Sequence, residues 1–179
     1  MIREFSVKLK PTNNKARTVF IISMSSAFAL IMLSTFIPLY KGVVSLGGLS
    51  LLVAAVTIYT KYISPIYYYD ITFDSEGTPL FVVRQLTGKR QTTLCRIGLA
   101  EVVKIEKENA TERCSHKTPY GFRKYNYLPT LAPDTTYRLT TMSRYEKSEI
   151  VIEASDEFAE LLGVYSAKAR EYQNSEDEE

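Results

Sequence analysis

The chain has 179 residues, of which 45% are hydrophobic, and a formal net charge of +2 at pH 7. Its cations are scattered, so they form no dense basic run of the kind that binds nucleic acid. Two cysteines, Cys95 and Cys114, are too few for a disulfide framework and lack the paired spacing of a zinc site. We therefore expect no nucleic acid partner, no metal and no cofactor.

Two apolar stretches dominate the N-terminal third. Residues 18–40 and 42–60 contain no Asp, Glu, Lys or Arg and are separated by Lys41 alone. A helix needs about 20 mostly apolar residues to cross the hydrocarbon core of a bilayer. The alternative is a pair of buried helices in a soluble domain, but such helices usually keep a charged stripe. The pattern predicts a transmembrane helical hairpin over residues 18–63, with spans at 18–40 and 43–63.

The cations that flank the hairpin predict its orientation. The first span follows five of them: Arg3, Lys8, Lys10, Lys15 and Arg17. Lys41 is the one cation between the spans, and cytoplasmic flanks carry the excess of Lys and Arg. We expect a multi-pass protein of the plasma membrane with residues 1–17 as a basic cytoplasmic N-terminus and both termini cytoplasmic. The turn Tyr40-Lys41-Gly42 should face outward, and Pro38 should terminate or kink the first span.

Beyond Pro65 the pattern changes to short alternating runs, which are typical of strands. In the first run, Tyr69, Ile71 and Phe73 alternate with polar residues. Seven strands are expected, at residues 69–73, 80–86, 91–97, 101–106, 124–128, 135–142 and 149–154. Asp74-Ser75-Glu76-Gly77 should turn the chain after the first strand, and Thr87-Gly88-Lys89 after the second.

A helix is expected to follow the last strand. Ser155 suits the N-cap, and the carboxylates of Asp156 and Glu157 suit the first turn. The apolar face of this helix consists of Phe158, Leu161, Leu162, Tyr165, Ala169 and Tyr172. Because that face must cover a core, residues 66–173 should form one cytoplasmic domain, with residues 174–179 as an acidic disordered tail.

The order of these parts resembles a family of small bacterial membrane proteins in which two spans precede a pleckstrin-homology-like (PH-like) domain. The resemblance is carried by Tyr69-Asp70-Ile71-Thr72, Phe81-Val82-Val83, Gly88-Lys89-Arg90 and the run from Leu94 to Glu106. It covers most of residues 18–173. It implies an α+β membrane protein whose hairpin precedes a seven-stranded PH-like β-barrel or sandwich, capped by the C-terminal helix. These are barrel-forming patterns and imply no chemistry.

Catalytic chemistry has little support in the sequence. His116 is the one histidine, so a Ser/His/Asp triad could be built only around it. Cys114 lies near it, but a competent pair also needs an orienting group and a pocket. Glu106 and Glu108 alternate with lysines, which is typical of a solvated face. We expect a non-enzymatic protein.

Basic and aromatic residues are interleaved after residue 112, a mixture that suits lipid headgroups or a peptide partner. The candidate contact residues are Arg113, Lys117, Phe122, Arg123 and Lys124. The alternative is a solvated loop whose aromatic rings pack on the barrel. Phosphoinositide-binding PH domains carry basic residues in the first hairpin, where this chain has the acidic turn Asp74–Gly77, so their lipid site is not carried over.

The predicted function is a membrane-anchored interaction module that presents its PH-like domain to a protein partner, to a membrane complex or to a second copy of itself. The bilayer is its anchor, and anionic lipid headgroups are a further candidate partner. The alternative is an accessory subunit of a transporter or channel that acts through the hairpin, because small residues allow another helix to approach. Those residues are Ser45, Gly47, Gly48 and Ser50.

Overall fold

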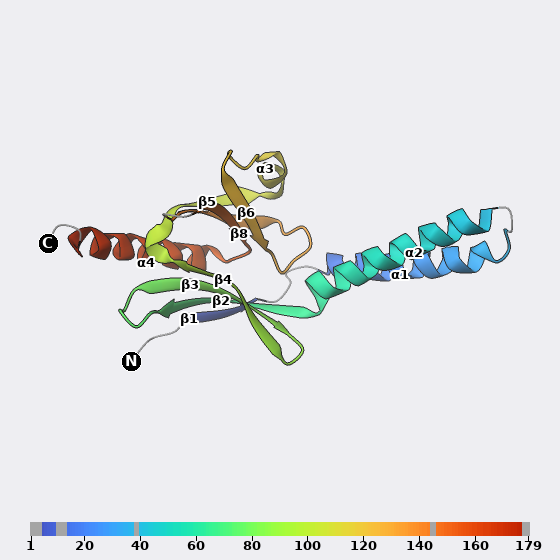
Figure 1. The fold of residues 1–179 in the computed structure, drawn as a ribbon, viewed down its shortest axis with the longest axis horizontal. Helices are drawn as coiled ribbons and strands as arrows, with labels where there is room; N and C mark the ends of the chain where they lie inside the picture. Colours follow the sequence, from blue (N-terminus) through green and yellow to red (C-terminus); the bar gives the residue numbers. More distant parts are fainter. Residues whose placement is uncertain (1–4, 10–13, 38–39, 144–145, 177–179) are drawn as a thin grey trace. The chain divides into compact units, whose positions relative to one another are not determined.

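The computed structural model describes residues 5–9, 14–37, 40–143 and 146–176. The chain divides into two compact units. One is Pro11–Pro65, and the other combines Met1–Lys10 with Ile66–Glu179. The first unit is helical, and the second contains two sheets and a long helix (Figure 1).

The helical unit consists of α1 (Lys15–Ser34) and α2 (Lys41–Ile58), which continues as the short π-helix η2 (Tyr59–Ile63). Both helices are long and apolar enough to cross a membrane, as the sequence predicts. Hydroxyl groups within them donate to helix carbonyls: Ser34 Oγ to the Ile31 oxygen at 2.6 Å, and Thr57 Oγ1 to the Val53 oxygen at 2.8 Å. These bonds satisfy polar atoms inside an apolar segment without water.

The break between the two helices lies earlier than predicted. α1 ends at Ser34, and Lys41 is already the first residue of α2, so the turn does not lie at Tyr40-Lys41-Gly42. Ile37 precedes a proline, and the residue before proline is disfavoured in the helical region, which accounts for an early end. Pro38 itself lies outside the described residues.

The first sheet contains four strands in the order β1 (Phe5–Leu9), β2 (Pro65–Phe73), β3 (Pro79–Thr87) and β4 (Arg90–Gly98). The sequence-based prediction treats residues 1–17 as a charged tail and contains no counterpart of β1. This strand pairs antiparallel with β2, so that Phe5 lies opposite Ile71 and Leu9 opposite Tyr67. The two strands that flank the helical hairpin in sequence are therefore neighbours in one sheet.

The second sheet has the order β5 (Val102–Asn109), β7 (Thr135–Met142), β8 (Lys147–Ile152) and β6 (Phe122–Tyr127). The 3-10 helix η3 (Leu99–Glu101) connects the sheets, and α3 (Ala110–Ser115) precedes β6. β6 is parallel to β8, whereas β7 is antiparallel to both β5 and β8. The seven predicted strands are present as β2 to β8, but the sheets do not close into a barrel. β4 and β6 remain terminal strands.

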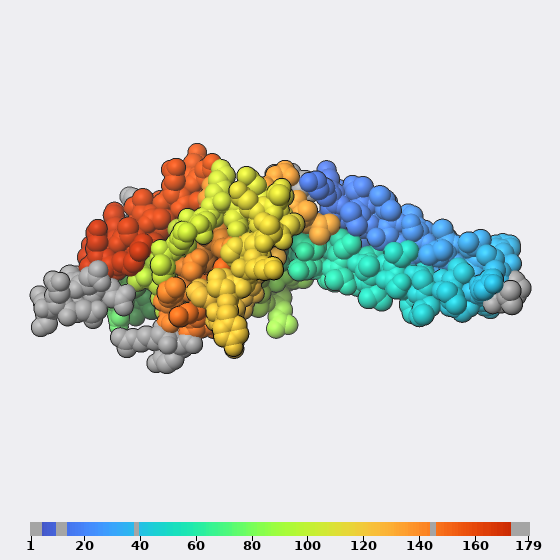
Figure 2. Space-filling view, turned by 90° about the horizontal axis from the view of Figure 1, so that it is seen from above, coloured from blue at the N-terminus to red at the C-terminus, as the bar shows by residue number. Residues whose placement is uncertain are grey.

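α4 (Asp156–Glu176) covers the core, with Phe158 and Leu162 buried among residues of both sheets. It lies alongside η3 and β5, as the red helix beside the yellow-green strand in Figure 2. The Phe158 ring stacks on Phe5 of β1, with centroids 6.1 Å apart. Tyr172, predicted for the apolar face, is 74% exposed because it lies beyond the core. The helix continues to Glu176, into the segment expected as a disordered tail, and residues 177–179 lie outside the described part.

Tyr69 joins the two sheets. Its hydroxyl donates to the Tyr127 oxygen at 2.6 Å and accepts from the Glu153 N–H at 3.3 Å. Burial raises the pKa of Tyr69 far above its ordinary value, so the hydroxyl keeps its proton and remains a donor. β2 is thereby connected to β6 and to the residue that follows β8.

Candidate functional site

The predicted contact patch comes from α3, the following loop and β6, and two of its four cations have a partner within the domain. Arg113 is half-buried, and its Nη2 donates to the Pro133 oxygen at 3.1 Å. Arg123 Nη1 lies 3.8 Å from Glu146 Oε1. Lys117 and Lys124 are exposed, and Phe122 is half-buried. Because the Arg123 side chain is 73% exposed, the patch offers a partner the charge of Arg123 and of the two lysines.

Beneath α3 lies a cluster of buried charges that the sequence analysis did not identify. Arg138 of β7 has 2% of its side chain exposed and forms an ion pair with Glu108 of β5. Its Nη1 lies 3.8 Å from Glu149 of β8, whose Oε1 is 3.1 Å from His116 Nε2. The prediction that Glu108 lies on a solvated face is therefore wrong, because residues 110–116 cover this face of the sheet.

The buried charge cluster around Arg138 has a structural role. Buried charges are tolerated when each has a partner of opposite sign, and removal of one partner leaves the other uncompensated. His116, the one histidine, is directed at Glu149, and among the described residues Cys114 makes no hydrogen bond to it. The thiol and imidazole that the sequence places close together therefore do not form a catalytic pair. No three His, Cys, Asp or Glu side chains in the described part lie close enough to hold a metal ion.

A cavity of about 470 Å³ opens where β4 of the first sheet faces β6, β7 and β8 of the second. We call it the seam cavity. Its walls mix aromatic, hydroxyl and acidic side chains, with Tyr127 Oη donating to the Leu94 oxygen at 3.3 Å across the seam. Its lining residues include Cys95, Arg96, Glu101, Tyr125, Ser143 and Glu146.

The groups in the seam cavity suit hydrogen bonding better than catalysis. Burial raises the pKa of the Cys95 thiol to about 11 and that of Tyr127 to about 12, so both keep their protons at neutral pH. A protonated thiol is a poor nucleophile. Glu146 accepts from Tyr125 Oη at 2.8 Å, and Glu101 accepts from Ser143 Oγ at 3.0 Å. Both carboxylates are thus held in place.

The small residues of the hairpin divide into two groups. A Cβ on Gly48 would lie 2.8 Å from Ile31 Cγ1 and 3.1 Å from the Ala27 oxygen, so Gly48 is the point where α2 packs on α1. Gly47 has more room, with Leu30 Cδ1 at 4.0 Å. Ser45 and Ser50 are exposed. Of the four small residues, Gly48 is therefore the one that packs within the hairpin.

No protein-family model matches this chain, and a comparison with curated proteins finds no significant match.

Proposed function

We propose that this chain is a membrane-anchored, non-enzymatic interaction module whose PH-like domain lies at the cytoplasmic face of the plasma membrane and binds a protein partner. The observation that carries the proposal is the pairing of β1 with β2. Because these strands flank the hairpin in sequence, the hairpin is an insertion between neighbouring strands of a sheet.

The insertion determines that both flanks of the hairpin lie on the same side of the bilayer. If α1 and α2 cross the bilayer, the segments on either side of them must lie on the same side of it to share one sheet. The excess of cations before α1 favours the cytoplasmic side. A domain attached at two points, rather than by one flexible tether, is suited to presenting a fixed surface beside the membrane.

The two packed sheets and the closing C-terminal helix support the PH-like assignment in part. The described residues depart from the family pattern in three ways. They form eight strands instead of seven, and the two sheets do not close into a barrel. In addition, β1 precedes the hairpin, whereas in the family pattern the two spans precede the whole domain.

The seam cavity is the surface that best fits a partner. β4 and β6 are terminal strands, and exposed strand edges accept an extended segment of another protein through backbone hydrogen bonds. The neighbouring cavity would take alternate side chains of such a segment, and its aromatic and acidic groups would select among them. The small residues of α2 give less support to the alternative of a channel or transporter subunit, because Gly48 already packs on α1.

Site-specific photo-crosslinking tests the proposal. A photoreactive residue in place of Arg96, which lines the seam cavity, should give a discrete adduct with one protein in intact membranes. The same residue in place of Arg170, which is exposed on α4, is the matched control. The proposal is wrong if both positions label the same set of proteins equally, or if the Arg96 position yields no protein adduct.

A further inference from the structure

Both connections to the helical hairpin lie at one end of the first sheet. The chain leaves this sheet after Leu9 of β1 and returns to it at Pro65 of β2. Leu9 lies opposite Tyr67, so the two connection points are close neighbours. We call this the membrane end of the sheet, a name that rests on the proposed function.

The turn between β3 and β4 lies at the same end. β2 runs away from the hairpin, and the turn after it, closed by hydrogen bonds between Asp74 and Thr78 and between Gly77 and Asp74, reverses the chain. β2 and β3 have nine residues each, so the end of β3 at Thr87 comes level with the beginning of β2. The next turn, which leads into β4 at Arg90, therefore lies at the end of the sheet where β2 begins.

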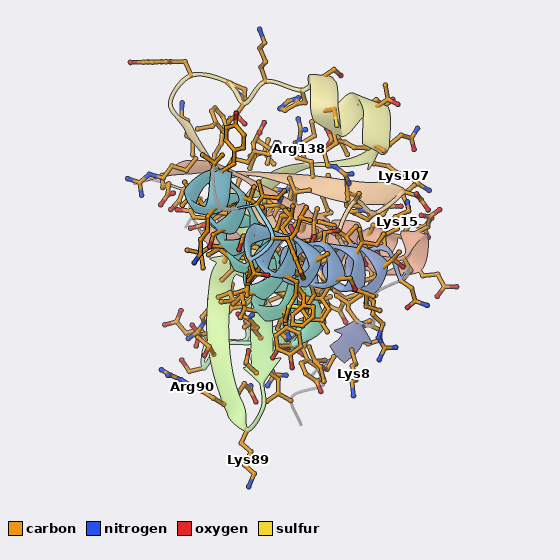
Figure 3. All side chains as sticks on the ribbon, turned by 90° about the vertical axis from the view of Figure 1, so that its right-hand side faces the viewer. Lys8, Lys15, Lys89, Arg90, Lys107 and Arg138 are labelled. Carbon is orange, nitrogen blue, oxygen red and sulfur yellow. The ribbon has the colours of Figure 1, made fainter. Side chains whose placement is uncertain are left out.

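The β3–β4 turn is tight and basic. Thr87 pairs with Arg90, which leaves Gly88 and Lys89 as a two-residue loop. Gly88 has a φ of 61°, the geometry of a type II′ hairpin turn with glycine in its first central position. Figure 3 shows Lys89 at the extreme end of this hairpin, directed away from the sheet, with Arg90 beside it.

Charge is sorted along the sheet. Among the described residues, no acidic side chain forms an ion pair with Lys89, Arg90 or the exposed Lys8 of β1. The turn at the opposite end is acidic, and its Asp74 pairs with Arg96 at 3.4 Å. Unpaired cations thus occupy the end where the chain enters the hairpin, and carboxylates occupy the other end.

We infer that the β3–β4 turn contacts the anionic lipid headgroups of the leaflet next to the domain, through Lys89 and Arg90. The continuous helix Lys41–Ile63 has 23 residues, about 35 Å, and so reaches slightly past a hydrocarbon core about 30 Å thick. A single residue, Ser64, separates that helix from β2. The membrane end of the sheet is therefore joined by a short connection to the end of the helix, and lipid phosphates at that surface would attract Lys and Arg.

This inference names a second candidate surface for lipid contact beside the patch that the sequence predicts. Exposed cations without an acidic partner among the described residues occur in both places, Lys117 and Lys124 in the predicted patch and Lys89 and Arg90 in the turn. The turn is preferred because it lies at the end of the sheet from which the hairpin leaves. The contact needs no headgroup pocket, so it should depend on surface charge and weaken with salt.

Fluorescence quenching in nanodiscs tests the contact with the full chain. Cys95 and Cys114 are changed to Ser, and a single fluorophore is attached through a cysteine at Gln91, beside the turn, or at Ser75, in the opposite turn. Lipids with a nitroxide on the headgroup quench what lies at the surface. In phosphatidylcholine with phosphatidylglycerol, the Gln91 label should be quenched much more than the Ser75 label. The difference should shrink in pure phosphatidylcholine and in high salt.

Charge variants assign the contact to residues. Lys89→Ser with Arg90→Ser should shift the contact equilibrium about 25-fold, roughly fivefold per cation, and bring the quenching near the Ser75 level. Lys117→Ser with Lys124→Ser is the matched control and should change nothing. Equal quenching at Gln91 and Ser75, or quenching that follows the control pair, would overturn the inference.

A third label separates this inference from the proposed function. A fluorophore at Ser50 of α2 should be quenched by nitroxides on the lipid acyl chains if the hairpin crosses the bilayer. Quenching at Ser50 without quenching at Gln91 leaves the proposed function intact and overturns the lipid contact alone. No quenching at Ser50 overturns both.

Discussion

Replacing Leu162 with alanine should destabilise the sheet domain by about 2 to 5 kcal/mol. Leu162 is 0% exposed and packs in the core that both sheets share with α4. The change removes three carbon groups worth about 0.8 kcal/mol each when buried, or about 2.4 kcal/mol before any cavity remains. The cavity adds to this loss because the surrounding core relaxes only partly.

Two neighbouring positions on α4 serve as controls for the predicted loss of stability. Leu161 is half-buried, so Leu161→Ala should cost about half the transfer term, near 1 kcal/mol. Val164 is 52% exposed, and Val164→Ala should change the free energy of unfolding by less than about 0.5 kcal/mol. The sequence alone places Leu161 and Leu162 on the same face and does not separate them, whereas the structure ranks them.

Urea unfolding of a soluble form, followed by far-UV circular dichroism, measures these differences. Because Leu9 lies opposite Tyr67, a short Gly/Ser loop can replace the hairpin and join β1 directly to β2. A fragment that begins at residue 66 would lack β1 and the Phe5 ring that stacks on Phe158, so it is a poorer host. Equal losses for the Leu161 and Leu162 variants, or an unchanged midpoint for Leu162→Ala, would refute the packing described for α4.

Two further predictions concern the hairpin and the start of α4. Gly48→Ala should lower the unfolding temperature of the full chain in detergent, because its Cβ would lie 2.8 Å from Ile31, whereas Gly47→Ala should not; a reversed order would contradict the helix contact. A hydrogen bond from Lys107 lowers the pKa of Asp156, so Asp156 stabilises the folded domain above its unfolded pKa of about 4, and this contribution is lost as pH falls through the lower folded value. The melting temperatures of the soluble form and of its Asp156→Asn variant should therefore differ at neutral pH and converge in acid, and a gap that widens in acid would contradict the assignment.

The seven strands from β2 to β8 could be predicted because each carries its own period-two pattern within a few residues. β1 carries the same signal, since Phe5, Val7 and Leu9 alternate with Ser6 and Lys8, but the prediction missed it. The strand is only five residues long, its Lys8 also suits a membrane flank, and its partner lies beyond two helices. Local pattern shows which residues share a face, but the pairing of distant strands depends on contacts that the pattern does not contain.

The buried charge cluster shows the same limit. Arg138 lies between the apolar residues Tyr137 and Leu139, so alternation places it on the outer face of its strand. Alternation does not reveal that α3 and the residues after it cover that face. The available signal was that Arg138 and Glu149 each lie in a predicted strand and that Glu108 lies just after one. Charges of opposite sign on one face of a sheet can pair with one another.

The β3–β4 turn was predicted as a turn, but its place beside the membrane was not. That inference needs the register of β1 on β2, which identifies the end of the sheet from which the hairpin leaves. Which end of a strand lies next to the hairpin thus depends on how the strands pair, and a local sequence pattern does not contain this pairing.

The most direct test of the account is a disulfide between β1 and β2 across the inserted hairpin. Lys8 lies opposite Tyr68, and cysteines at directly opposed positions of antiparallel strands can be bridged. With the native cysteines changed to Ser and a protease site inserted after α1, oxidised membranes should yield two fragments that stay joined until the disulfide is reduced. A chain with cysteines at Lys8 and Thr72, which are not opposed, is the control. Joined fragments for the Lys8 and Tyr68 pair alone are the predicted result. Fragments that separate without reductant, or that join equally in the control, would contradict the insertion of the hairpin between neighbouring strands.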